Sequence, residues 1–277
     1  MKIAQYYDDS QIRLGEIKDN RLIPLDFAGD MLDFIQSDRS CKPTGKSTPL
    51  DQVRYAPCIS RPSKIIGIGL NYLDHIQESK GAVPERPLVF AKFPNTLAAH
   101  KDAITWNPEL TKKVDYEAEL AVVIGKTTYQ CSEEEAEKAV FGYTCSNDVS
   151  ARDLQFGDKQ WVRGKTLDTF CPLGPWIVTP DEIEDLNSLG IKSILNGRVM
   201  QDSNTRHMLF KVPQLISFIS MNFTLRPGDV ILTGTPHGVG AFRKPSVYMK
   251  DGDEVVVEIE QIGRLMNTCK TQPVPIP

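Results

Sequence analysis

Short runs in which apolar and polar residues alternate recur along the chain and predict a protein built mainly from β-strands. Three such runs open the sequence, KIAQYY, IRLGEIK and RLIPLD, with polar turns at residues 8–10 and 18–20 between them. Asn196-Gly197 between two apolar runs predicts a two-residue hairpin. Further strand-like runs are KIIGIG, LVFAKF, ELAVVIG, GPWIVT, KSILNGRVMQD, GDVILTG and DEVVVEIE.

Helical patterns are few and short, and they cover residues 72–79, 132–140 and 210–220. Ser132 with Glu135 three residues later forms a capping box, and Pro213 fits the first turn of the third helix. Because the strands do not alternate regularly with long helices, a doubly wound sheet or a TIM barrel is disfavoured. The predicted class is α+β, predominantly β.

A polar stretch, QSDRSCKPTGKSTPLDQ, separates the first three strands from the rest. It predicts a small β-rich N-terminal domain over residues 1–58 and a larger domain over residues 59–277. The C-terminal TQPVPIP predicts an extended tail.

Composition narrows the classes of function. A hydrophobic content of 40% and a charged content of 25% are those of a globular protein, and the net charge of −4 argues against a nucleic-acid partner. The polar N-terminus does not resemble a signal peptide, and no apolar stretch reaches the roughly 18 residues of a membrane span. The six cysteines form no CxxC pair, which favours free thiols and a cytoplasmic location.

Three acidic residues occupy every second position in VDYEAELAVVIG, residues 114–125. Side chains alternate between the faces of a strand, so Asp115, Glu117 and Glu119 are expected on one face. They form either a solvated edge or a site for a hard cation, because carboxylates suit Mg²⁺, Mn²⁺ or Ca²⁺. Asp148 in SNDVSARDLQ either supplies another carboxylate to that cation or caps the short helix that follows.

His75 and Glu78 lie three residues apart on a predicted helix. On one helical face, a carboxylate can orient an imidazole that acts as a general base, and the alternative is an ordinary surface pair. The following SKGAVPERP suits a mobile lid. Tyr72 stands where a dinucleotide fingerprint needs its third glycine, so GIGLNY does not predict a dinucleotide site.

Lys165 and the segment TGTPHGVG are two further candidates. Lys165 can hold negative charge that develops on a substrate, or it can be an exposed lysine. Residues 233–240 can aim backbone N–H groups and hydroxyls at a carboxylate, but they lack the Gly-Lys-Ser/Thr ending of a nucleotide-binding P-loop.

From residue 64 to residue 267 these blocks, in this order, resemble the fumarylacetoacetate hydrolase family, in particular its acylpyruvase and 2-hydroxyhepta-2,4-diene-1,7-dioate isomerase-like branch. The N-terminal segment resembles the small domain of some longer members. The matching blocks are GxNYxxH from residue 69, YEAELAVVIGK, NDVSARDLQ, GKTLDTFCPLGPWIV, LNGRVMQDSNT, LRPGDVILTGTPxGVG and DGDEVVVEIEQIGRLMN.

The resemblance implies a fold and a set of site residues. The fold is a mixed β-roll with few helices, usually assembled as a homodimer. Glu117, Glu119 and Asp148 match carboxylates that bind Mg²⁺, with Mn²⁺ or Ca²⁺ as substitutes, and Asp115 is not an implied ligand. His75 and Glu78 match a pair that activates water from a lid helix, and Lys165 matches a lysine near the reacting centre. The implied substrate contacts are Lys92, Arg152, Gln155, Gly234 and Thr235.

The sequence departs from the family pattern at a few positions, which bear on contacts with the distal part of a substrate. The metal-binding residues and His75 are unchanged. The departures are Phe93, Asn95, His100, Arg206 and His207.

The function predicted first is metal-dependent hydrolysis of a carbon–carbon bond in acylpyruvate-type 1,3-dicarbonyl acids. His75, oriented by Glu78, would take a proton from water that attacks the distal carbonyl. The same site also suits oxaloacetate decarboxylation, keto–enol tautomerisation, and isomerisation of 2-hydroxy-dienedioates in aromatic breakdown. The presence of both His75 and Glu78 favours hydrolysis. A non-catalytic metal- or ligand-binding protein would be expected to lack a carboxylate, the base or the lysine, and all are present here.

Overall fold

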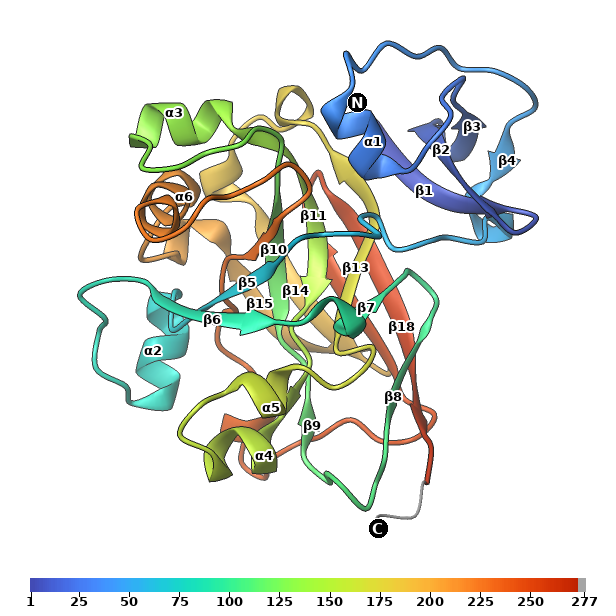
Figure 1. Ribbon diagram of the computed structural model, residues 1–277. Helices are drawn as coiled ribbons and strands as arrows, with labels where there is room; N and C mark the ends of the chain where they lie inside the picture. The colour runs from blue at the N-terminus through green and yellow to red at the C-terminus, as the bar shows by residue number, and fades with distance from the viewer. Residues whose placement is uncertain (274–277) are drawn as a thin grey trace.

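The computed structural model describes residues 1–273, and most of its strands belong to two mixed sheets that pack against each other (Figure 1). The larger sheet has eleven strands. In spatial order they are β4 (Thr48–Pro49), β3 (Arg21–Pro24), β2 (Gln11–Lys18), β1 (Lys2–Asp8), β13 (Cys171–Val178), β11 (Val140–Asn147), β10 (Ala118–Ile124), β16 (Val230–Leu232), β5 (Ile65–Gly69) and β6 (Leu88–Lys92), with β7 (Leu97–Ala98) beside β13.

The second sheet has five strands, and two short strands pair separately next to it. The five are β15 (Arg198–Asn204), β14 (Gly190–Leu195), β17 (Glu254–Ile259), β18 (Gly263–Thr271) and β8 (Ala103–Trp106), and the separate pair is β12 (Ser150–Ala151) with β9 (Val114–Asp115). The predicted α+β class, predominantly β, is therefore confirmed.

Strand β10 is the centre of the molecule, because every one of its residues is buried. Leu120 and Val122 pack in one core with Val257 and Leu265 of the second sheet. On the opposite face, Ala121 and Val123 join a second core that contains residues of the N-terminal segment. A strand covered on both faces reads as a continuous apolar run, as LAVVI does here.

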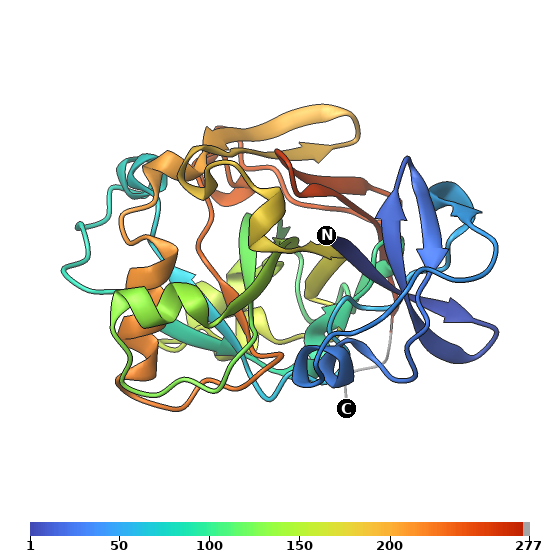
Figure 2. The same ribbon diagram turned by 90° about the horizontal axis from the view of Figure 1, so that it is seen from above.

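The N-terminal segment lies at one end of the molecule (Figure 2). Its first strand continues the large sheet, because β1 pairs with β13 through Lys2 and Ile3. Helix α1 (Met31–Gln36) starts at a capping box between Asp30 and Asp33 and buries Phe34 in the core shared with β10. The three expected strands are present as β1–β3. The domain boundary at residue 58 stays a prediction.

The remaining helices are short, and three of them surround the site described below. They are α2 (Leu73–Ser79), α3 (Glu133–Lys138), α4 (Arg152–Gly157), α5 (Val162–Lys165) and α6 (Val212–Ser220). The capping box of Ser132 and Glu135 at α3 is confirmed. No helix within residues 1–273 is both long and apolar enough to cross a membrane.

Two local predictions have different outcomes. Asn196 and Gly197 join β14 to β15 with φ values of 50° and 76°, which are those of the predicted two-residue hairpin. The expected single strand over residues 114–125 is interrupted at Tyr116 and Glu117, between β9 and β10. The predicted extended tail falls largely on residues 274–277, outside the described part of the chain.

Candidate active site

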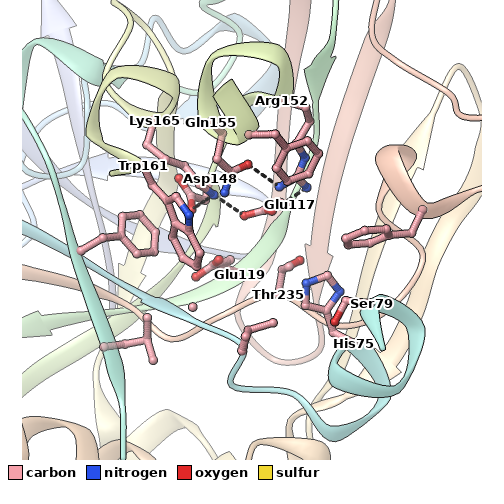
Figure 3. Close-up of a pocket in the computed structure, with 16 residues that line it drawn as sticks. His75, Ser79, Glu117, Glu119, Asp148, Arg152, Gln155, Trp161, Lys165 and Thr235 are labelled. Carbon is pink, nitrogen blue, oxygen red and sulfur yellow. Dashed lines mark hydrogen bonds and ion pairs between the residues drawn. The ribbon is translucent and has the colours of Figure 1, made fainter. Parts of the chain in front are cut away.

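Three carboxylates meet in a pocket at the end of strand β10. The antiparallel pairing of β10 with β11 places Ala118 opposite Asn147, so Asp148 emerges beside Glu117. The amide of Asp148 donates a hydrogen bond of 2.9 Å to the carbonyl of Glu117. One carboxylate oxygen from each of Glu117, Glu119 and Asp148 lies within 4.8 Å of the others (Figure 3). All three side chains are buried, so the solvated-edge interpretation is wrong.

Buried cations compensate most of this negative charge. The Nζ atom of Lys165 lies 2.6 Å from Oε2 of Glu117 and 2.5 Å from Oδ2 of Asp148. Lys92 lies 2.6 Å from Oδ1 of Asp148, and Arg152 lies 2.6 Å from Oε1 of Glu117. Lys165 is therefore not the exposed lysine of the alternative interpretation.

Glu119 lies in the least compensated position of the cluster. Its Oε2 accepts a hydrogen bond of 2.7 Å from the amide of Gly234, but no ion pair joins it to a cation within residues 1–273. Burial, together with Asp148 and Glu117, raises the pKa of Glu119 well above its usual value. Burial also acts to raise the pKa of Glu117, but Lys165 and Arg152 outweigh it and hold that pKa below its usual range.

These charges fit a divalent cation. With Asp115, four buried carboxylates face three buried cations, Lys92, Lys165 and Arg152, so with all four ionised one negative charge remains for a metal cation to compensate. Carboxylate oxygens are the ligands that Mg²⁺, Mn²⁺ and Ca²⁺ prefer. Glu117, Glu119 and Asp148 are the residues that would hold such an ion.

Asp115, which had no role in the sequence interpretation, holds the surroundings of the site together. Its Oδ2 accepts from Nε of Arg152 at 2.8 Å and from the amide of Ala241 at 2.9 Å. Its Oδ1 accepts from the amide of Gly240 at 2.8 Å. Asp115 therefore fixes both the guanidinium that contacts Glu117 and the chain at the end of the segment of residues 233–240.

Helix α2 brings His75 to the pocket, as expected. The Nδ1 atom of His75 lies 3.3 Å from Oε2 of Glu78, one helical turn further along. Figure 3 shows His75 with Ser79 and Thr235 on one side of the pocket and Lys165 with Trp161 on the other. The arrangement places an imidazole and the carboxylate cluster around one cavity.

Aromatic side chains form much of the remaining wall, and sequence analysis missed them. Phe90 and Trp161 pack edge to face with ring centroids 5.5 Å apart, and Phe242 lies 5.8 Å from the ring of His75. Phe156 also lines the pocket. No local pattern marks these residues, because they come from four separate segments. Only Phe90 belongs to a predicted strand.

The residues implied as substrate contacts divide into two groups. Arg152, Gln155 and Thr235 line the pocket, and Gln155 accepts a hydrogen bond of 2.9 Å from Arg152. Lys92 and Gly234 contact Asp148 and Glu119 instead and are not among the residues that line the pocket. Buried Gln201 donates to the hydroxyl of Thr235 at 2.8 Å and was also missed. Roles of these residues in substrate binding stay predictions.

None of the departures from the family pattern lines this pocket. Phe93 is exposed, and Asn95 donates to Thr166 and Asp168 outside it. His100 accepts from the amide of Met266, and burial lowers its pKa to about 4. Arg206 and His207 belong to a short turn after β15.

The sequence and the fold are both similar to those of known proteins. The family model for the fumarylacetoacetate (FAA) hydrolase C-terminal domain matches residues 64–270. The Rattus norvegicus protein named mitochondrial oxaloacetate tautomerase Fahd2a is 49% identical over 220 residues, which cover 79% of this chain and 70% of that protein.

Two solved structures are similar over nearly the full length. A fumarylacetoacetate hydrolase from Exiguobacterium antarcticum has a TM-score of 0.90 and 37% identity, covering 98% of this chain and 100% of that chain. A 2-hydroxyhepta-2,4-diene-1,7-dioate isomerase from Mycobacterium marinum has a TM-score of 0.83 and 34% identity, covering 98% and 99%. With its carboxylate cluster, its pocket and these matches, the chain belongs to the fumarylacetoacetate hydrolase family.

Proposed function

We propose that this enzyme catalyses keto–enol tautomerisation of oxaloacetate. The observation that carries the proposal is the buried cluster of Glu117, Glu119 and Asp148, which opens into the same pocket as His75. A divalent cation held by these carboxylates would act as a Lewis acid toward the carboxylate and 2-oxo oxygens of the substrate. The choice of reaction is supported by the Rattus norvegicus relative, whose name is that of an oxaloacetate tautomerase.

In this reaction a proton leaves C3 of oxaloacetate and a proton is added to the oxygen on C2, and no water is consumed. We assign removal of the C3 proton to His75, which accepts it on Nε2 of its imidazole. Glu78, 3.3 Å from Nδ1, stabilises the charge that then develops on the ring. His75 then delivers this proton to the oxygen on C2, which completes the enol and returns the imidazole to its starting form; in the reverse direction the same proton moves from the oxygen to C3.

Other residues bind the substrate and exclude water. The carbonyl oxygen of the Gln155 amide accepts from Arg152, so its NH₂ group can donate to the distal carboxylate of oxaloacetate. Phe90, Trp161 and Phe242 cover the pocket with apolar surface. Removal of water strengthens the electrostatic interactions inside the site.

Hydrolysis of an acylpyruvate is the second candidate, because the contact between His75 and Glu78 also suits activation of water. The two reactions differ in their products. Hydrolysis of acetylpyruvate releases pyruvate and acetate, whereas tautomerisation leaves the carbon skeleton of oxaloacetate intact.

The test follows the ultraviolet absorbance of enol oxaloacetate with Mg²⁺, after subtraction of the rate with Mg²⁺ alone. We expect acceleration by the protein, its loss with EDTA, and a fall of about 10²–10⁴-fold for His75→Ala. Lys192→Ala, in an exposed ion pair on β14, is the matched control and should keep the full rate. A protein that does not exceed the Mg²⁺ background refutes the proposal. If the protein instead releases pyruvate from acetylpyruvate, hydrolysis of an acylpyruvate is its function.

A further inference from the structure

Helix α2, which carries His75, is short and has no side-chain cap at its N-terminus. It spans seven residues, and its N-cap residue, Tyr72, makes no side-chain capping hydrogen bond. Helices of this length are not stable by themselves in water, so tertiary contacts must hold α2 in place. Residues 80–83 that follow it are exposed.

The first turn of α2 is held through Asp74. Its Oδ2 lies 3.0 Å from Nδ1 of His237 and accepts a hydrogen bond of 2.5 Å from the hydroxyl of Ser203. The amide of His237 also approaches Oδ1 of Asp74, at 3.4 Å. One side chain of α2 thus contacts both β15 and the segment of residues 233–240.

The last turn of α2 is held by Gly238, the residue after His237 in the segment of residues 233–240. The amide of Gly238 donates to Oε1 of Glu78 at 2.9 Å, while the other oxygen of Glu78 faces His75. Consecutive residues 237 and 238 therefore fix both turns of the helix, with His75 between the two points of attachment.

We propose that Asp74 and His237 are positioning residues that hold His75 at the pocket. The inference rests on the proposed function, in which His75 moves the proton. His237 does not line the pocket, and its side chain is 48% exposed, so it acts through α2 and not on the substrate. Position 237 is the x of the TGTPxGVG block, and in this chain it carries a partner for Asp74.

The expected effect is moderate, because an exposed contact between two polar side chains contributes little energy. Without the contact between Asp74 and His237, α2 lies against residues 233–240 in a smaller fraction of the molecules. The observed rate falls in proportion to that fraction. We expect His237→Ala to lower kcat for oxaloacetate by about fivefold. Affinity for Mg²⁺ should not change, since neither residue contacts the carboxylate cluster.

The experiment compares the Mg²⁺-loaded wild type with His237→Ala, His237→Lys, Asp74→Asn and the control Lys192→Ala. Lysine at position 237 keeps an N–H donor for Asp74, so His237→Lys should recover most of kcat, whereas a merely structural defect would not be rescued. Hydrogen–deuterium exchange of residues 72–80, measured without substrate, should increase in His237→Ala and Asp74→Asn only. Calorimetry with Mg²⁺ provides the affinity.

Unchanged exchange in both His237→Ala and Asp74→Asn, or a kcat of His237→Lys as low as that of His237→Ala, overturns the inference. The exchange measurement needs no turnover, so it tests the attachment of α2 even if oxaloacetate is not the substrate. Failure of the proposed function would appear separately, as absent activity in the wild type. Should His237→Ala not fold, Asp74→Asn and His237→Lys decide the outcome.

Discussion

Replacing Asp115 with alanine is expected to destabilise the protein strongly, although Asp115 is not a proposed metal ligand. The substitution removes the acceptor of the buried Nε of Arg152, at 2.8 Å, and of the amides of Gly240 and Ala241. Breaking a buried ion pair by deleting one partner costs about 3–5 kcal/mol. Each orphaned buried N–H adds about 1–3 kcal/mol unless water or local rearrangement reaches it.

Arg152 keeps its ion pair with Glu117 at 2.6 Å, and the loop of residues 240–241 can relax, so we take the lower end of the ion-pair value, about 3 kcal/mol, as the expected loss in free energy of unfolding. For a protein of this size that corresponds to a fall in Tm of roughly 10 °C. The assay is urea unfolding followed by tryptophan fluorescence, with EDTA present so that metal binding does not contribute.

Asp202→Ala is the matched control, since Asp202 forms an exposed ion pair with Lys192 at 3.4 Å. Its loss should be below about 1 kcal/mol. If Asp115→Ala also loses less than about 1 kcal/mol, the contacts of Asp115 do not stabilise the fold and the reasoning fails. The loss should persist at high salt, because buried pairs are poorly screened.

Two further predictions concern the pocket and the cluster. A Cβ on Gly69 would lie 2.5 Å from Cζ3 of Trp161, so Gly69→Ala must displace that ring. We expect a higher KM for oxaloacetate and altered tryptophan fluorescence. An unchanged KM would contradict the role of Trp161 in the wall of the pocket. Because the pKa of Glu119 is raised, Glu119 keeps its proton in the folded, metal-free protein at pH values above 4.5 at which it loses it in the unfolded chain. The free energy of unfolding of the wild type, relative to that of Glu119→Gln, should therefore decrease as pH rises from 4.5 toward the raised pKa. Urea unfolding with EDTA at several pH values measures this difference. A difference that does not change with pH would refute the prediction.

Features that depend on neighbouring residues were predicted well. The hairpin at Asn196-Gly197 and the capping box at Ser132 and Glu135 both rest on backbone preferences and hydrogen bonds within a few residues. The same is true of α2, where His75 and Glu78 meet through helical spacing. In each case the predicted interaction joins residues of one short segment.

The role of the acidic segment could not be derived in this way. Alternation predicted that its carboxylates share a face, but it left a solvated edge and a cation site as alternatives. Their surroundings come from distant segments: Lys92, Arg152 and Lys165 contact Glu117 or Asp148, and Gly234 contacts Glu119. The residues alone left Asp148 as a further carboxylate for the cation or as a helix cap, and the family resemblance favoured the first. The register of β10 with β11 explains why Asp148 meets Glu117.

The sequence by itself therefore determined the strands, turns and caps, and it identified the carboxylates and the imidazole as candidate chemistry. Only the tertiary structure decided which charges are buried together. Lys92 contacts Asp148 across 56 positions of the chain, and Asp115 pairs with Arg152 across 37. Such contacts depend on sheet register and shared burial, and local backbone preferences carry no information about either.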